Sequence, residues 1–404
     1  MSKLQITAVL CFVEISGMAG FASFPALVPS FLAEWSLSNT QAGWISGIYY
    51  AGYMLSAPIL TSLTDRVDPR RILLLGAGFS GASALAYGLL ATGFWSALTL
   101  RFVAGMGLAG TFMPGLKLLS DHTEGPLQSR YLAFYTSSFS IGASTSYFMS
   151  GEIAATLDWR WSFGLAAVGS LASVIVIQTR LPAGQFPEEP NSRMLLDFRP
   201  VLRTKPAMAY ILAYTGHAWE LFSFRSWIVA LLAFTQSLQA WGSVRNLTLI
   251  AAIVNLLGLP ASVGGNELAV RFGRRRVITL IMIVSFLVSC VAGFAASSSV
   301  LIVIGLCLVY GLTVMADSAS LTAGAVEAAP PGHKGATLAV HSTLGFGAGF
   351  LGPLAVGAVL DLFGGASLAW GMAFMTMGLG SALGPIALRI AKRTNRGNQE
   401  IRKS

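Results

Sequence analysis

The sequence predicts an all-α membrane protein with twelve transmembrane helices in two pseudo-symmetric six-helix bundles. Apolar residues make up 54% of the 404 residues and charged residues 11%, whereas a soluble domain is roughly 25% charged. The mean hydropathy is +0.67. Twelve apolar runs are long enough to cross about 30 Å of hydrocarbon. A basic turn between two such runs occurs twice, 205 residues apart, which indicates two equivalent halves.

Helix is the state expected for every run, because lipid leaves open sheet edges unsatisfied and no run shows the alternation of a barrel strand. The first run is too long for a signal peptide and contains Glu14, so we expect it to be retained as a helix. In chain order, the expected helix cores are 5–28, 42–63, 72–93, 96–118, 131–153, 161–180, 207–235, 246–267, 277–297, 300–324, 336–360 and 367–390.

Residues 181–206 form the longest polar stretch, and five prolines within it would interrupt a long helix. We therefore expect four parts in this chain. They are an N-terminal six-helix bundle at 1–180, a cytoplasmic linker at 181–206, a C-terminal six-helix bundle at 207–391 and a basic cytoplasmic tail at 392–404.

The distribution of lysine and arginine predicts the orientation. The segments expected on the side of the two termini hold all 26 of these residues except Arg101, Arg160, Arg225 and Arg245. Basic loops stay on the cytoplasmic side, so both termini are expected there, in a bacterial cytoplasmic (inner) membrane. The net charge of +9 does not indicate a nucleic-acid partner, because the basic residues lie between apolar runs rather than on one surface.

No cofactor, metal or catalytic motif is expected. Cys11, Cys290 and Cys307 lie inside apolar runs without CxxC spacing. His217 and His341 with scattered carboxylates could describe a metal path, but two histidines without a His- or Cys-rich tract are a thin basis for one. The GxSxG, HExxH and GxxxxGK[ST] motifs are absent from the sequence, which argues against an enzyme and a nucleotide-driven pump.

Two motifs resemble those of a known family. The run that begins at Arg101 is rich in glycine. The first basic turn carries Leu63, Asp65, Arg66, Arg70 and Arg71, and the second keeps Gly273 and the arginines but has Val270 where the acid would be. These residues resemble the fourth-helix and loop signatures of the major facilitator superfamily, and the resemblance covers essentially the whole chain. It implies secondary transport by alternating access and says almost nothing about the substrate.

The resemblance implies that Asp65 holds a cytoplasmic gate together with Arg66, Arg70 and Arg71. A carboxylate is favoured at a helix N-terminus and beside arginine, and a contact made in one conformation alone stabilises that conformation. The alternative is that the turn serves only as a topology signal. Asp68 could partly substitute for Asp65.

Six ionisable residues inside the runs are candidates for the mechanism, because a charge at the bilayer centre is costly and normally faces a cavity or a partner. The resemblance places the first, fourth, seventh and tenth helices around a cavity, and all six lie in these helices. They are Glu14, Arg101, His217, Glu220, Arg225 and Asp317. The alternative to a functional role is a set of static ion pairs that fix the helix packing.

We expect proton coupling at Glu220, Glu14, Asp317 and Arg101, and substrate binding at Arg225, His217, Tyr53, Tyr147 and Trp219. The predicted function is proton-coupled transport of a small organic solute, with a carboxylate to match the arginines, by a monomer whose other partners are protons and membrane lipid. The alternatives are proton-driven multidrug or metabolite efflux and, more remotely, a transporter-like sensor. The run at 131–153 lacks the Gly-Pro pair of drug exporters, which disfavours drug efflux.

Overall fold

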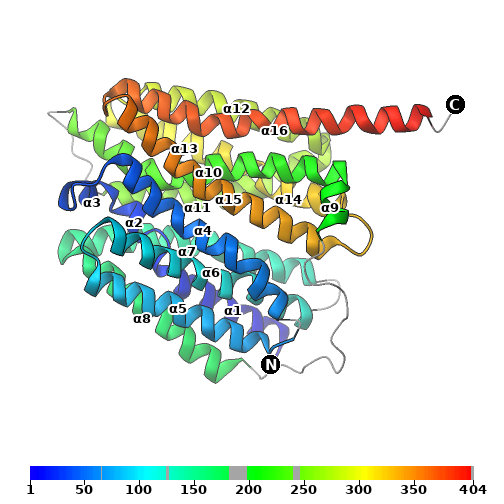
Figure 1. Ribbon diagram of the computed structural model, residues 1–404, viewed down its shortest axis with the longest axis horizontal. Helices are drawn as coiled ribbons and strands as arrows, with labels where there is room; N and C mark the ends of the chain where they lie inside the picture. The colour runs from blue at the N-terminus through cyan, green and yellow to red at the C-terminus, as the bar shows by residue number, and fades with distance from the viewer. Residues whose placement is uncertain (65, 124–126, 182–197, 240–245, 402–404) are drawn as a thin grey trace. The chain divides into compact units, whose positions relative to one another are not determined.

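The computed structural model describes residues 1–64, 66–123, 127–181, 198–239 and 246–401, and within these ranges all regular structure is helical (Figure 1). The chain divides into two compact units. The first unit is Met1–Leu195 with Val244–Leu256, and the second unit is Leu196–Ser243 with Leu257–Ser404.

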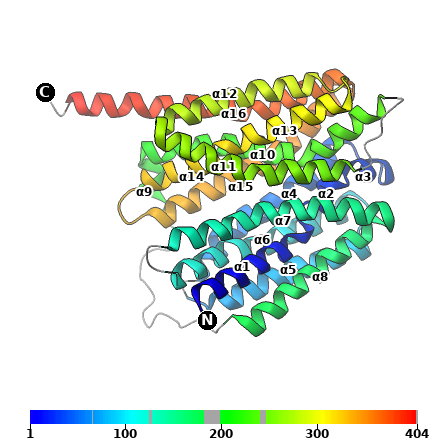
Figure 2. The ribbon, with the colours of Figure 1, turned by 180° about the vertical axis from the view of Figure 1, so that it is seen from behind.

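The first unit is a bundle of long helices that begins with a broken one. Helix α5 packs on both α6 and α8, and α1 packs on α7 and α8; Figure 2 shows α1, α5 and α8 side by side. The elements are α1 (Lys3–Gly17), the 3₁₀ helix η1 (Met18–Gly20), α2 (Ser23–Ala26), α3 (Val28–Glu34), α4 (Asn39–Leu63), α5 (Pro69–Leu90), α6 (Phe94–His122), α7 (Gln128–Thr156) and α8 (Trp159–Arg180).

The second unit is built around α10, which is buried along most of its length and packs on α15 and α16. Helix α12 lies along α16 in both views (Figures 1 and 2). The elements are α9 (Arg199–Arg203), α10 (Lys205–Ser237), α11 (Leu247–Phe272), α12 (Arg274–Phe294), α13 (Val300–Ala316), α14 (Ser318–Glu327), α15 (Lys334–Leu362) and α16 (Ser367–Ile401). Residues Leu247–Leu256 of α11 belong to the first unit.

The prediction of one continuous helix over 5–28 was wrong. Helix α1 ends at Gly17, and η1, α2 and the start of α3 follow. Pro25 and Pro29 lack the N–H that a continuous helix would need. Ser146 of α7 stabilises the broken backbone, because its hydroxyl donates to the carbonyl of Ala19 at 2.6 Å and accepts from the amide of Ala22 at 3.0 Å.

The run at 300–324 is also divided, at Asp317, which ends α13 and precedes α14. The amide of Ala319 donates to the hydroxyl of Ser262 at 3.3 Å instead of to a carbonyl of its own helix. A side chain that enters the hydrogen-bond ladder in this way is a common cause of a helix kink. Asp317 therefore lies at a break rather than inside a regular helix.

Two boundaries differ from those predicted. Helix α10 begins at Lys205, inside the expected linker, because Pro206 falls in its first turn, where the missing N–H is not needed. The backbone of α16 continues to Ile401, through most of the expected tail. Residues 182–197 of the linker and 402–404 of the tail lie outside the described part of the chain.

Glycines bring particular helices into close contact. A Cβ at Gly105 of α6 would overlap the backbone carbonyl of Tyr49 in α4, and one at Gly216 of α10 would overlap the carbonyl of Gly380 in α16. These glycines therefore allow backbone-to-backbone packing, as is usual between helices in membranes.

Among the described residues, ten helices are long and apolar enough to cross a membrane. Helices α4 and α7 match two of the twelve predicted runs in position but are not among the ten. Both are rich in serine and small residues, which lowers their hydropathy. The count of twelve spans stays a prediction.

Candidate functional site

All six ionisable residues selected from the sequence are buried, with exposed fractions of 4% or less. The structure divides them between the two units. Glu14 and Arg101 belong to the first unit, and His217, Glu220, Arg225 and Asp317 belong to the second.

Glu14 lies on α1, one turn before the break. One carboxylate oxygen, Oε2, is 3.4 Å from the hydroxyl of Tyr135, and the other has no hydrogen-bond partner among the described residues. The Tyr135 hydroxyl is closer to the carbonyl of Phe112, at 2.9 Å. Since a phenol has one proton to donate, Glu14 receives little stabilisation from it. Within the described ranges, no cationic nitrogen lies within 4 Å of Glu14.

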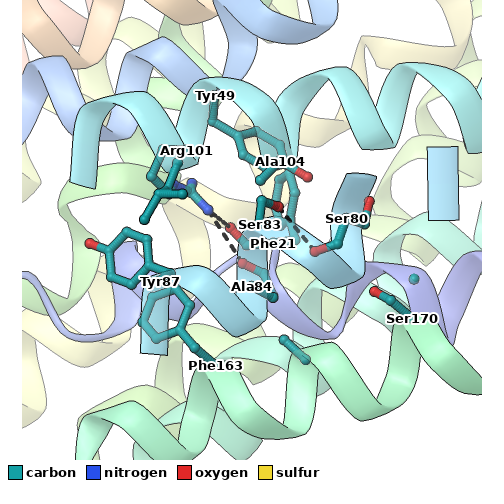
Figure 3. Close-up of a pocket in the computed structure, with 14 residues that line it drawn as sticks. Phe21, Tyr49, Ser80, Ser83, Ala84, Tyr87, Arg101, Ala104, Phe163 and Ser170 are labelled. Atoms are coloured by element: carbon teal, nitrogen blue, oxygen red, sulfur yellow. Dashed lines mark hydrogen bonds between the residues drawn. The ribbon is translucent and has the colours of Figure 1, made fainter. Parts of the chain in front are cut away.

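Arg101 lies at the break of the first run, where it donates hydrogen bonds to two backbone carbonyls. Its Nη1 is 3.3 Å from the carbonyl oxygens of both Gly20 and Phe21, and its guanidinium carbon is 4.2 Å from the centre of the Tyr49 ring. Figure 3 shows these contacts. Among the described residues, no carboxylate lies within 4 Å of the Arg101 nitrogens, and its role in proton coupling stays a prediction.

The aromatic candidates of the first unit, Tyr53 on α4 and Tyr147 on α7, are fully buried. The hydroxyl of Ser146, next to Tyr147, bonds to the break after α1. The substrate-binding role of both tyrosines stays a prediction.

Glu220 is held by two serines from other helices of the second unit. Ser285 of α12 donates to Oε1 at 2.9 Å, and Ser381 of α16 donates to Oε2. No cationic nitrogen of the described residues lies within 4 Å of this carboxylate. His217 and Arg225 of the same helix therefore do not form an ion pair with Glu220.

His217 instead faces Asp317. Its Nδ1 is 2.8 Å from Oδ1 of Asp317, a close contact that is not aligned as a hydrogen bond. The His217 ring is 5.5 Å from that of Tyr214, which stacks on His341 at 3.6 Å. His341 in turn contacts the hydroxyl of Thr322 at 3.2 Å, as expected for a structural hydrogen bond.

The remaining two candidates of the second unit lie on either side of Glu220 in α10. The Trp219 indole donates to the carbonyl of Thr376 at 3.0 Å, and its ring packs against Gly352 of α15 and Gly380 of α16. The guanidinium carbon of Arg225 is 6.0 Å from the centre of the Phe222 ring. Their substrate-binding roles stay predictions.

Asp65, the central residue of the predicted gate, lies outside the described residues. Asp68 caps α5, because its Oδ1 accepts from the amide of Arg70 at 2.9 Å. The Arg70 guanidinium donates to the carbonyl of Gln178, whereas Arg66 and Arg71 are exposed. In the second basic turn, Arg274 pairs with Glu327 of α14 at 2.6 Å. The gating role of the first turn stays a prediction.

Several residues of these sites were not selected from the sequence. Serines and tyrosines are common in membrane helices, and nothing in their spacing shows which of them faces a buried carboxylate. The site residues that were not selected are Tyr87, Tyr135, Ser146, Tyr214, Ser285, Thr322 and Ser381. Within the described ranges, no group of three or more His, Cys, Asp or Glu side chains could hold a metal ion.

The sequence profile of the Major Facilitator Superfamily matches residues 10–353. The chain belongs to the Major Facilitator Superfamily. The family and the fold class predicted from the sequence are thus confirmed.

Curated relatives in this superfamily are distant. An uncharacterized MFS-type transporter, YcaD of Salmonella arizonae, is 26% identical over 182 residues, which cover 44% of this chain and 47% of the relative. Protein spinster homolog 1 of Homo sapiens is 23% identical over 240 residues, covering 56% of this chain and 45% of the relative. The matched segments thus span about half the length of these relatives.

Solved structures of the superfamily cover almost the whole chain. A bacterial homologue of the human lysosomal transporter Spinster, in an inward-facing and unoccupied conformation, has a TM-score of 0.72 at 14% identity and covers 96% of this chain and 95% of its own. The nucleoside transporter NupG has a TM-score of 0.77 at 14% identity, and the match covers 96% of this chain and 99% of the NupG chain. At these identities the likeness shows the fold alone.

Proposed function

We propose that this membrane transporter is a proton-coupled secondary carrier of a small organic solute that bears a carboxylate, and that Glu220 carries the proton. The observation that supports this proposal is the environment of Glu220. The carboxyl group is buried in the second unit and held by two neutral serine hydroxyls, and no cation of the described residues neutralises it.

A charge in such a place is costly, and binding a proton removes the cost. The serines suit both states, because a hydroxyl donates to a carboxylate and accepts from a carboxylic acid. Glu220 could therefore load and release a proton without rearrangement of its neighbours. Glu14 has a similar environment in the first unit and is the second candidate, and Asp317, which faces His217, is the third.

The buried arginines support a carboxylate on the solute. Arginine binds carboxylates with charge-assisted hydrogen bonds, and Arg101 has no carboxylate partner among the described residues. A solute whose carboxylate binds Arg101 would link substrate binding to the contacts that Arg101 makes with the backbone of Gly20 and Phe21.

Transport in proteoliposomes tests the coupling after carboxylate-bearing solutes have been screened by thermal shift. We expect Glu220→Gln to abolish accumulation driven by a pH gradient but to retain solute exchange, which needs no net proton movement. The matched control is Glu267→Gln, which removes the same charge from an exposed position and should leave both activities within a factor of two.

Normal accumulation by Glu220→Gln would place the proton site elsewhere, with Glu14 or Asp317 next. Loss of exchange as well would make Glu220 a binding or packing residue. The direction of the gradient that drives accumulation in the wild-type protein distinguishes symport from the antiport expected of an efflux carrier.

A further inference from the structure

A small pocket in the first unit opens beside the break of the first run (Figure 3). Helices α4, α5, α6 and α8 surround it, together with Gly17, Gly20 and Phe21. The space available to the centre of a water molecule is about 20 Å³, which is room for one or two waters and too little for a whole organic solute.

Arg101 is the one ionised side chain among the described residues that line this pocket. It is 2% exposed, and no carboxylate of the described residues lies within 4 Å of its nitrogens. Its hydrogen bonds to Gly20 and Phe21 are long, at 3.3 Å each, and both come from Nη1. Its Nε has no hydrogen-bond partner within the same ranges. The positive charge therefore receives only partial compensation from backbone carbonyls and the Tyr49 ring.

A second polar group in the lining also lacks a partner. The hydroxyl of Tyr87 on α5 is buried and makes no hydrogen bond to any described residue. The Tyr87 ring is fixed by Phe163, which stacks on it with ring centres 3.9 Å apart, and Tyr87 lies next to Arg101 in Figure 3. The pocket thus combines a buried cation with a buried hydroxyl, and none of its described lining residues is acidic.

We propose that this pocket binds one compact anionic group against Arg101. A buried charge without a counter-charge is strongly unfavourable, and water in the pocket would supply hydrogen bonds but no counter-charge. An anion in the pocket would neutralise the guanidinium of Arg101, which lines it. The group is either an inorganic ion the size of chloride or the carboxylate of the transported solute. Binding of the solute's carboxylate rests on the proposed function, whereas binding of an inorganic ion does not.

Thermal stability of the purified full-length protein tests the site directly. Chloride or formate is added at constant ionic strength to a buffer of isethionate, a bulkier sulfonate reference anion that carries no carboxylate. A ligand that binds only the folded protein raises its Tm in a saturable way. We expect such a rise in the wild-type protein with chloride or formate, and at least a tenfold weaker midpoint in Arg101→Gln.

Arg160→Gln is the matched control, because it removes the same charge from an exposed position of the same unit; it should keep the wild-type midpoint. Tyr87→Phe retains the ring and removes the hydroxyl, so it should weaken the midpoint by about threefold and remains informative if Arg101→Gln does not fold. A wild-type protein without a saturable rise overturns the proposal, as does an Arg101→Gln midpoint equal to that of Arg160→Gln.

Transport distinguishes the two sources. If chloride inhibits uptake by competing with a carboxylate solute, the solute supplies the anionic group at Arg101. If uptake requires chloride, an inorganic ion supplies it. Uptake that does not change with chloride over the range that shifts Tm overturns the solute's carboxylate as the source, because chloride and that carboxylate would compete for Arg101. The anion-dependent Tm should persist in Glu220→Gln, so failure of proton coupling at Glu220 and failure of this site are separate results.

Discussion

His217 and Asp317 form a buried contact between two helices of the second unit, with Nδ1 and Oδ1 2.8 Å apart and both side chains at most 3% exposed. If both groups are charged, removal of one leaves the other buried without a counter-ion, which typically costs about 3–5 kcal/mol. Replacement of both by neutral amides leaves no charge behind. The pair is thus expected to be coupled in stability.

A double-mutant cycle tests this expectation. We predict that Asp317→Asn lowers the free energy of unfolding by about 3–5 kcal/mol and that His217→Gln/Asp317→Asn costs clearly less than the sum of the single variants. Denaturation of the purified protein measures both. Glu327→Gln, which breaks the more exposed pair with Arg274, should cost about 1 kcal/mol or less. Additive costs for His217 and Asp317 would show that the two groups are not coupled.

The sequence predicted which residues of the candidate sites carry charge, because an ionisable group inside an apolar run is unusual whatever the fold. It did not predict their partners. Glu220 is surrounded by Ser285 and Ser381, not by the neighbouring His217 or Arg225. Spacing along one helix does not give these partners, because contacts with other helices determine them.

One serine of α7 makes two hydrogen bonds to the backbone at the break after α1. Ser146 donates to the carbonyl of Ala19 and accepts from the amide of Ala22, so it replaces hydrogen bonds that a continuous helix would make within itself. We predict that Ser146→Ala destabilises the protein by about 1–3 kcal/mol, the cost of buried polar groups left unsatisfied.

The same denaturation measurement checks this prediction, with Thr156→Ala as the control. Thr156 lies on α7 as well, but it is exposed and its hydroxyl bonds only to the preceding turn, so its replacement should change the stability by about 0.5 kcal/mol or less. Equal effects of the two variants would mean that the break is maintained by the prolines and by packing rather than by Ser146.

The turn before α5 contains two aspartates, Asp65 and Asp68, whose roles can be tested separately. Asp68 caps α5, and asparagine is as good a cap as aspartate. We predict that Asp68→Asn changes stability and transport little. If Asp65 holds the cytoplasmic gate, as proposed from the sequence, Asp65→Asn should lower transport, while expression and solute affinity in detergent stay within a few-fold. Unchanged transport in Asp65→Asn would leave the turn as a topology signal.

Hydropathy predicted that each run is helical, but not where a helix is interrupted. The runs at 5–28 and 300–324 are apolar throughout, and apolar character reports burial in lipid or protein rather than an unbroken hydrogen-bond ladder. The interruptions depend on Pro25 and Pro29 in the first run and on Ser262, from another helix, in the second. Pro25 and Pro29 are visible in the sequence, whereas the contact of Ser262 with Ala319 is not.

The fold of the superfamily accounts for the basic turns and for the two units. The number of membrane crossings depends on α4 and α7, whose serine, glycine and tyrosine content keeps them outside the ten most apolar helices. Tyr49, Tyr50 and Tyr53 of α4 are buried within the first unit. Helices that bury polar faces against protein need less apolar surface toward lipid, so we expect both to span the membrane.

This expectation fixes the sidedness of the loops and is the last prediction. Cys11, Cys290 and Cys307 are first replaced by alanine, and single cysteines are then introduced at Ala33 and Val67, on either side of α4, and at Leu127 and Leu157, on either side of α7. With cytoplasmic termini, a membrane-impermeant maleimide should label Ala33→Cys and Leu157→Cys in intact cells, and Val67→Cys and Leu127→Cys only after permeabilisation.

Labelling of both members of a pair from the same side would show that the helix between them does not cross, and the prediction of twelve spans would be wrong. Reversed labelling of both pairs would retain twelve spans and place the termini, with the basic turns, outside the cytoplasm, against the charge distribution of the loops.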